Sequence, residues 1–120
     1  MQKQGVRGYR IPKRTARIVF DGGEYEGAEV RTQLDVPIGL FLEIQDLVNN
    51  DRALQVFERF GDGALVDWNL EDDNGKPIPA TGKGMLAIPA ALANIIIEQW
   101  VEAVANPPAP LPRSSGNGNT

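Results

Sequence analysis

The chain has 120 residues, of which twelve are basic and sixteen acidic, and it contains neither cysteine nor histidine. Without cysteine there are no disulfides and no thiol chemistry. Without either residue type, most zinc sites and the usual general base near neutral pH are excluded as well. The length allows one domain at most.

The charge is divided unequally along the chain. Residues 1–17 carry six basic residues and no acid, while residues 18–120 hold the other six basic residues and all sixteen acids, so a body of −10 follows an arm of +6. We expect a flexible basic arm over residues 1–14, a single domain over 15–106 and a disordered Pro/Ser/Gly-rich tail over 107–120. No apolar run suits a signal peptide or a spanning helix, so we expect a soluble intracellular protein without membrane partners.

The first predicted elements are two β-strands around a glycine-rich turn. Arg17–Asp21 is a short β-type run, and the turn residues Gly22-Gly23 follow it. Over Tyr25–Leu34 apolar and polar residues partly alternate, which predicts a second strand with Val30 and Thr32 on the same face. The two segments together predict a β-hairpin.

Two helices are predicted next. Pro37 suits the first turn of a helix, and helical periodicity continues from there to Asn49. Apolar residues occupy more than half of the circumference of this helix. We expect Asp51 to cap a second helix over Arg52–Phe60, with Gly61 as its C-terminal glycine.

The segment after the second helix combines a buried-type tryptophan with turn residues. Residues 64–70 fit either a strand or a helical turn, and we favour a short extended piece that packs Trp68 against the core. Asn74-Gly75 then predicts a sharp turn, and Pro77 and Pro79 predict a stiff crossing to the last helix.

The last helix is predicted from Pro89 to about Ala105, after a linker at Gly82-Lys83-Gly84. Its core stripe contains Trp100, and a polar stripe at i, i+4 and i+8 contains Asn94, Glu98 and Glu102. Together the elements predict a small α+β domain in which an N-terminal β-hairpin packs on three to four α-helices.

Three kinds of chemical site can be compared with the sequence, and none fits. A calcium loop built on Glu71–Gly75 would place Thr81 where the bidentate glutamate is needed. Asp67 could form a catalytic pair with Asp72 or Asp73, but acids clustered on a turn are expected to be solvated and ionised. Gly82-Lys83-Gly84 lacks the glycine spacing and the Ser or Thr of a phosphate loop. We therefore expect no catalytic residue, no metal, no cofactor and no enzymatic activity.

Both long helices carry more apolar residues than a core of this size normally absorbs. This excess predicts a protein-binding groove or a self-association face, unless each helix is buried between the hairpin and its neighbours. The candidate contact residues are Leu40, Ile44, Leu47, Ile97 and Val101.

The basic arm is the remaining candidate for binding. Six cations can contact phosphates, but Tyr9 is the only ring available for base stacking, and the acidic body would repel a nucleic acid. We therefore regard nucleic acid as an improbable partner. We favour either a flexible arm or a lead-in to the first strand that docks on acidic protein surface.

The order of residues from Trp68 to Thr81, followed by Ile88-Pro89 at the start of an apolar helix, resembles the tail assembly chaperones of long-tailed, siphovirus-type bacteriophages. The similarity extends upstream to Val36–Phe41 and Tyr25–Gly27 and covers roughly residues 17–112. The residues that mark it are Trp68, Asn74, Gly75, Pro77, Pro79 and Trp100.

The resemblance implies a non-enzymatic helper in virion assembly. Such proteins bind the long, helical and apolar tape-measure protein in the host cytoplasm, assist tail assembly and are absent from the finished particle. In many relatives a programmed frameshift extends some copies at the C-terminus, and the tail here suits such a junction. Two other classes stay open: a structural neck or tail protein of the virion, and a small nucleic-acid-binding or regulatory module that uses the basic arm.

Overall fold

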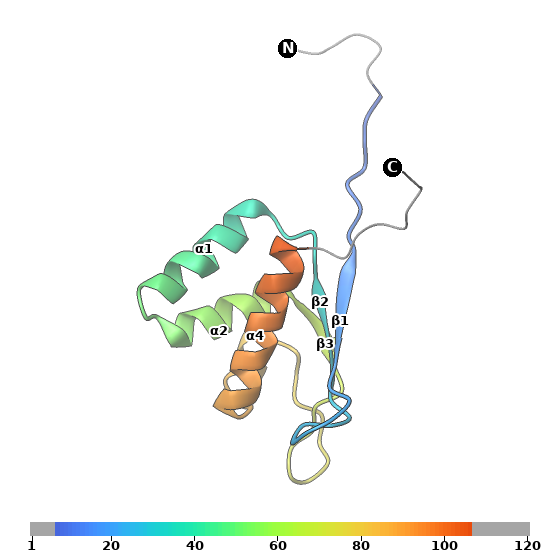
Figure 1. Ribbon diagram of the computed structural model, residues 1–120, viewed down its shortest axis with the longest axis vertical. Helices are drawn as coiled ribbons and strands as arrows, with labels where there is room; N and C mark the ends of the chain where they lie inside the picture. The colour runs from blue at the N-terminus through green and yellow to red at the C-terminus, as the bar shows by residue number, and fades with distance from the viewer. Residues whose placement is uncertain (1–6, 107–120) are drawn as a thin grey trace.

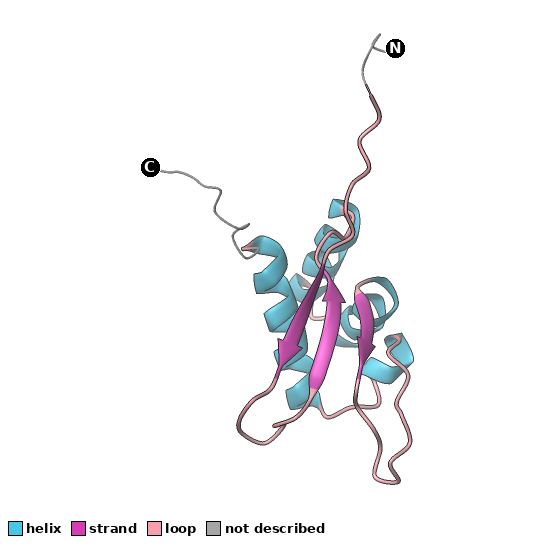
Figure 2. Ribbon diagram, turned by 90° about the vertical axis from the view of Figure 1, so that its right-hand side faces the viewer, coloured by secondary structure: helices cyan, strands magenta, loops and turns pink. Residues whose placement is uncertain are grey.

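The computed structural model describes residues 7–106, in which a three-stranded antiparallel sheet carries helices on one face (Figures 1 and 2). The strands lie in the order β1-β2-β3, with bounds Thr15–Val19, Glu29–Gln33 and Leu65–Trp68. The helices are α1 (Ile38–Asn49), α2 (Ala53–Gly63), α3 (Gly82–Met85) and α4 (Ala90–Ala105). The predicted α+β class is confirmed; the tail at 107–120 lies outside the described residues.

Strands β1 and β2 form the predicted hairpin, with a longer connection than expected. Gly23 and Gly27 both have positive φ, 81° and 98°, and the chain between the strands closes with the Phe20 amide donating to the Ala28 carbonyl at 2.9 Å. The second strand therefore begins at Glu29. The predicted alternation is confirmed, because the side chains of Val30 and Thr32 are buried.

The prediction that Asp51 caps the second helix is wrong. Asp51 has a φ of 57°, and the N–H of the following Arg52 donates to the Leu47 carbonyl at 2.9 Å. Asp51 thus takes the left-handed conformation that ends α1 and reverses the chain. Helix α2 starts directly afterwards, with Arg52 at its N-cap and no side-chain cap.

The prediction that Gly61 ends the second helix is also wrong, since α2 continues to Gly63. Gly61 is needed for close packing. A Cβ at this position would lie 2.5 Å from the Thr81 carbonyl oxygen and 2.6 Å from the Gly82 Cα. The missing side chain lets the backbone of residues 81–82 lie directly against α2.

The predicted linker at Gly82-Lys83-Gly84 is instead the short helix α3, with both glycines buried. The hydroxyl of Thr81 accepts from the Gly84 amide at 3.1 Å, and Asp62 Oδ1 accepts from the Gly82 amide at 2.7 Å. A Cβ on Gly84 would collide with the Pro79 carbonyl. The glycines therefore allow a close contact with α2 and with the Trp68–Pro79 segment.

Trp100 lies at the centre of the core, as predicted. Its side chain is fully buried, and the rings of Phe41 and Phe60 meet it edge-on at centroid distances of 5.6 and 5.2 Å. The indole Nε1 donates to the Gln33 carbonyl at 3.0 Å. One side chain thus connects α4 with α1, α2 and the end of β2.

Thr32 is fully buried in this core, and its Oγ1 has no hydrogen-bond partner among the described residues. Because valine has nearly the same shape without the hydroxyl, Thr32→Val is expected to raise the free energy of unfolding by about 1 kcal/mol. Urea denaturation measures the change, with the exposed strand residue Thr15→Val as the matched control. If Thr32→Val lowers the free energy of unfolding and Thr15→Val does not, the Thr32 hydroxyl must have a hydrogen-bond partner in the folded protein.

An ion pair closes the hairpin where the arm enters the domain. Arg14 Nη2 and Nε lie 2.8 and 3.0 Å from the two carboxylate oxygens of Asp35, and the Arg14 amide donates to Asp35 Oδ2 at 2.7 Å. These hydrogen bonds, from the side chain first and then the backbone, lower the pKa of Asp35 from 3.8 to about 2.

The Arg14–Asp35 ion pair makes the stability of the domain depend on pH. Because the pKa of Asp35 is lower in the folded than in the unfolded chain, its contribution is present above about pH 4 and is lost as the pH falls towards 2. We expect Asp35→Asn to lower the Tm at pH 7 and the difference from the wild type to shrink between these values. A Tm difference that does not change with pH would contradict this role.

Candidate protein-binding groove

A largely apolar groove lies between α1 and α4, with a volume of about 450 Å³. Figure 1 shows α1 at the end of the domain opposite the Trp68–Pro79 turn, with the C-terminal part of α4 extending towards it. The groove is lined by Ile44, Gln45, Val48 and Asn49 from α1, and by Ile97, Glu98, Val101, Glu102, Ala105 and Asn106 from the end of α4.

The floor of the groove is aliphatic. Ile44 is fully buried and Ile97 is 7% exposed, so both also belong to the core. Val101 is half-buried, and Val48 is 49% exposed. An incoming side chain would therefore contact Val48 and Val101 above a rigid base.

The two lips of the groove differ in chemistry. On α4 the polar lip is acidic, formed by the exposed residues Glu98 and Glu102 one turn apart. On α1 the lip residues Gln45 and Asn49 share a helix face with two exposed apolar residues, because the spacing i, i+4, i+7 and i+11 repeats on one side of a helix. These two residues are Ile38, 68% exposed, and Leu42, 58% exposed.

The structure separates the five predicted contact residues into two groups. Ile44, Ile97 and Val101 meet in the groove. Leu40 and Leu47 instead face α2: Leu40 covers Gly63, and Leu47 lies beside the Glu43–Arg59 ion pair, whose Nη2–Oε1 distance is 3.0 Å. The latter two are therefore ordinary contacts between helices.

Sequence reasoning missed the exposed apolar residues Ile38, Leu42 and Val48. They are not among the candidate contact residues, because nearly every face of this helix is apolar and the pattern does not single out one of them. A signal was available, since Gln45 and Asn49 are polar and lie on the same face as Ile38 and Leu42. That face is the outer one.

The Trp68–Pro79 segment is a structural turn. Trp68 Nε1 donates to the Ile78 carbonyl at 2.6 Å, and Asp72 Oδ1 accepts from the amides of Asn74 and Lys76 at 2.8 and 3.0 Å. Gly75 has a φ of 76°, which glycine adopts without strain. Pro77 and Pro79 carry the chain from this turn to α3, and a bridge between Glu71 and Pro77 closes its base.

Replacing Trp68 with phenylalanine leaves a smaller aromatic ring and removes the indole N–H. The half-buried Ile78 carbonyl then loses its donor, so we expect the free energy of unfolding to fall by about 1–3 kcal/mol. Chemical denaturation measures this loss. An unchanged midpoint would mean that water replaces the indole at the carbonyl.

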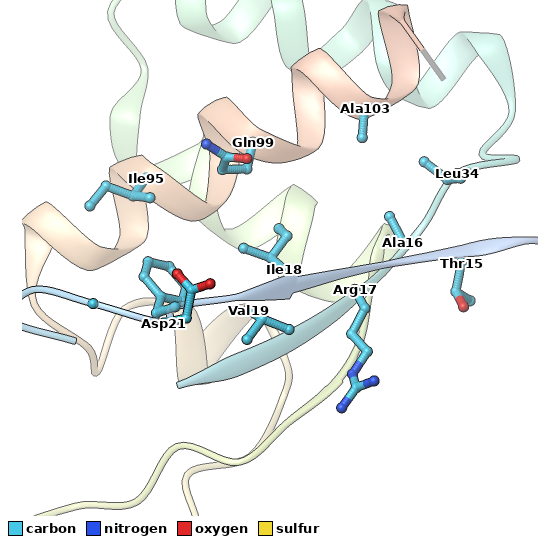
Figure 3. Close-up of a pocket in the computed structure, with 12 residues that line it drawn as sticks. Thr15, Ala16, Arg17, Ile18, Val19, Asp21, Leu34, Ile95, Gln99 and Ala103 are labelled. Carbon is cyan, nitrogen blue, oxygen red and sulfur yellow. The ribbon is translucent and has the colours of Figure 1, made fainter. Parts of the chain in front are cut away.

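A second, larger hollow of about 820 Å³ lies between β1 and α4 (Figure 3). Ile18 and Ala16 point from the strand towards Gln99 and Ala103 of α4, while Arg17 points to the other side of the sheet. Its lining is mixed, because the polar residues Asp21 and Gln99 lie beside the apolar residues Ile18 and Ile95. It is less suited than the α1–α4 groove to an apolar ligand.

Within residues 7–106, no group of three or more acidic residues is placed to hold a metal ion, and no helix is long and apolar enough to cross a membrane. Comparisons with protein-family models, with curated protein sequences and with solved structures found no significant match to this chain.

Proposed function

We propose that the protein is a non-enzymatic assembly chaperone whose α1–α4 groove holds an apolar helical segment of a partner protein. The observation that supports this most is the groove itself: an aliphatic floor of Val48 and Val101 between a polar lip and an acidic lip. Grooves of this kind bind amphipathic helices through apolar residues spaced i, i+3 or i+4, and i+7.

The charge of the groove defines the partner more closely. Glu98 and Glu102 on the α4 lip favour a helix whose apolar stripe is flanked by lysine or arginine. The exposed residues Ile38 and Leu42 extend the apolar surface along α1. The net charge of −10 on residues 18–120 keeps such a complex soluble.

The strength of a single contact is modest. Four anchor side chains at about 1.5–3 kcal/mol each give about 6–12 kcal/mol, while association costs about 4–15 kcal/mol. One groove therefore holds one helix weakly. Many copies along a long helical protein would retain it together, and each copy would still release easily.

The resemblance to phage tail assembly chaperones gives such a partner an identity. A tape-measure protein is long, helical and apolar, and we propose that copies of this chain cover it in the host cytoplasm until the tail is assembled. The groove and the resemblance support this proposal independently, since the residues that mark the resemblance lie mainly in the Trp68–Pro79 turn and not in the groove.

The test is co-expression with the product of the very long, coiled-coil-rich reading frame expected next to this gene. We expect that protein to be soluble and to co-purify with the wild-type chain, and to aggregate without it. Aggregation in both cases would contradict the proposal. Mass spectrometry of purified particles separates the rival class, because a structural virion protein stays in the particle.

A further inference from the structure

We propose that, in the absence of the partner helix, the α1–α4 groove of one copy binds the basic arm of a second copy of this chain. The part of the arm that makes this contact is Arg7–Lys13. The contact combines two features that lie on different parts of the same molecule, an exposed basic segment with apolar side chains and an acidic-lipped apolar groove.

The arm makes little use of its own domain. Residues 7–14 are all exposed, and Figures 1 and 2 show them extending from β1 away from the helices. Tyr9 is 81% exposed and Ile11 71% exposed. No hydrogen bond or ion pair to the side chains of Arg7, Arg10 or Lys13 is present in the described part of the chain. The arm is therefore available to another molecule.

The pattern of the arm complements the groove. In an extended segment Tyr9 and Ile11 lie on one face, about 7 Å apart, so the ring of Tyr9 and the branched side chain of Ile11 can both meet the floor at Val48 and Val101. Arg7 and Lys13 lie on the same face at either side of this pair and can reach the acidic lip formed by Glu98 and Glu102. Pro12 lacks an N–H, so the arm is suited to binding through side chains better than to adding a strand.

The dimensions also agree. Seven extended residues span about 23 Å. The part of α4 that lines the groove, from Ile97 to Asn106, is about 15 Å long. The arm of one copy can therefore cover the whole groove of another, and a reciprocal exchange of two arms closes a symmetric dimer.

Strand pairing between two copies is a weaker alternative. The edge strand β1 contains Arg17 at its centre, and it follows the basic arm directly. Antiparallel pairing of β1 with itself would place cation against cation, which is unfavourable. The acidic groove is the complementary surface for the arm.

Arm binding would protect the apolar groove until a helix displaces the arm. This consequence rests on the proposed function, whereas the contact between arm and groove does not. The co-expression test can fail while the dimer is still observed, so failure of the proposed function and failure of the contact between arm and groove are distinguishable.

The test uses sedimentation velocity of the full chain over a range of concentrations. We expect the wild type to dimerise, and to do so about tenfold more weakly when salt is raised from 0.05 to about 0.5 M, because charges at the lip are screened. Reversing the arm (Arg7→Glu, Arg10→Glu and Lys13→Glu) or the lip (Glu98→Lys and Glu102→Lys) should each give a monomer. Combining both reversals in one chain should restore the dimer.

Matched variants make each result decisive. The control Glu71→Lys with Asp73→Lys changes the charge equally at the distant turn and should leave the dimer intact, and circular dichroism confirms that each variant folds. A wild type that is monomeric at all concentrations would overturn the proposal. A gel shift of DNA by this monomer would indicate that the arm binds nucleic acid instead. Loss of the dimer by arm reversal without restoration by the lip reversal would overturn the groove as the docking site.

Discussion

Replacing Gly61 with alanine is expected to lower the free energy of unfolding by about 2–4 kcal/mol. In an exposed helix the same change stabilises by about 1 kcal/mol, because glycine is a poor helix former. Here the added Cβ would lie 2.5 Å from the Thr81 carbonyl oxygen. That backbone cannot move away easily, because Asp62 holds the neighbouring Gly82 amide. The steric effect therefore outweighs the helix propensity.

Gly39 provides the matched control for this prediction. It also lies in a helix, α1, but a Cβ there would meet no atom within 4 Å. Gly39→Ala is expected to raise the free energy of unfolding by about 0.5–1 kcal/mol. Urea denaturation of both variants measures the two changes. Stabilisation by both variants would show that α2 does not pack against residues 81–82 as described.

Replacing Val48 with glutamate is expected to weaken binding of a helical partner about 100-fold. The variant removes an apolar contact from the floor of the groove and places a charge that a bound helix would desolvate, together about 3 kcal/mol. Val48 is 49% exposed, so the free domain should remain folded. The probe is a synthetic helix with leucines at i, i+3, i+4 and i+7 between flanking lysines, and fluorescence anisotropy measures its Kd.

Leu86→Glu is the control for the groove variant. Leu86 is 41% exposed, similar to Val48, but it does not line the groove. Its substitution should leave the Kd of the probe unchanged. Ile97→Glu is unsuitable as a test, because Ile97 is 7% exposed and a charge there would unfold the core. If Val48→Glu and Leu86→Glu raise the Kd equally, the helical probe does not bind specifically in the groove.

The elements could be predicted from the sequence because their signals are local. The hairpin, the α1 and α4 helices and the Asn74-Gly75 turn follow from periodicity and from residues that demand particular backbone angles. The outward face of α1 has a weaker local signal, the polar residues Gln45 and Asn49. Most faces of this helix are apolar, so the packing of the domain decides that Ile44 is buried and Leu42 exposed.

The errors at glycines have a common cause. The local pattern predicts a helix end at Gly61 and a linker at Gly82 and Gly84, which are the usual local roles of glycine. In the structure they allow two backbones to come together that are about 20 residues apart in the sequence. A contact of this kind is tertiary, so the local pattern does not contain it. For the same reason only part of the groove could be predicted. Its residues on α4 follow from the helical wheel, whereas the residues of α1 that line it depend on how the helices pack.

The most direct test of the central claim is a methyl NMR titration of the full chain with the lysine-flanked leucine helix. The account predicts that the largest shifts occur at Ile44, Val48, Ile97 and Val101, in the groove. The exposed methyl groups of Val19 and Val66 on the sheet should stay unchanged. The largest shifts on the sheet, or no shifts at millimolar helix, would contradict the claim that the groove is the binding site.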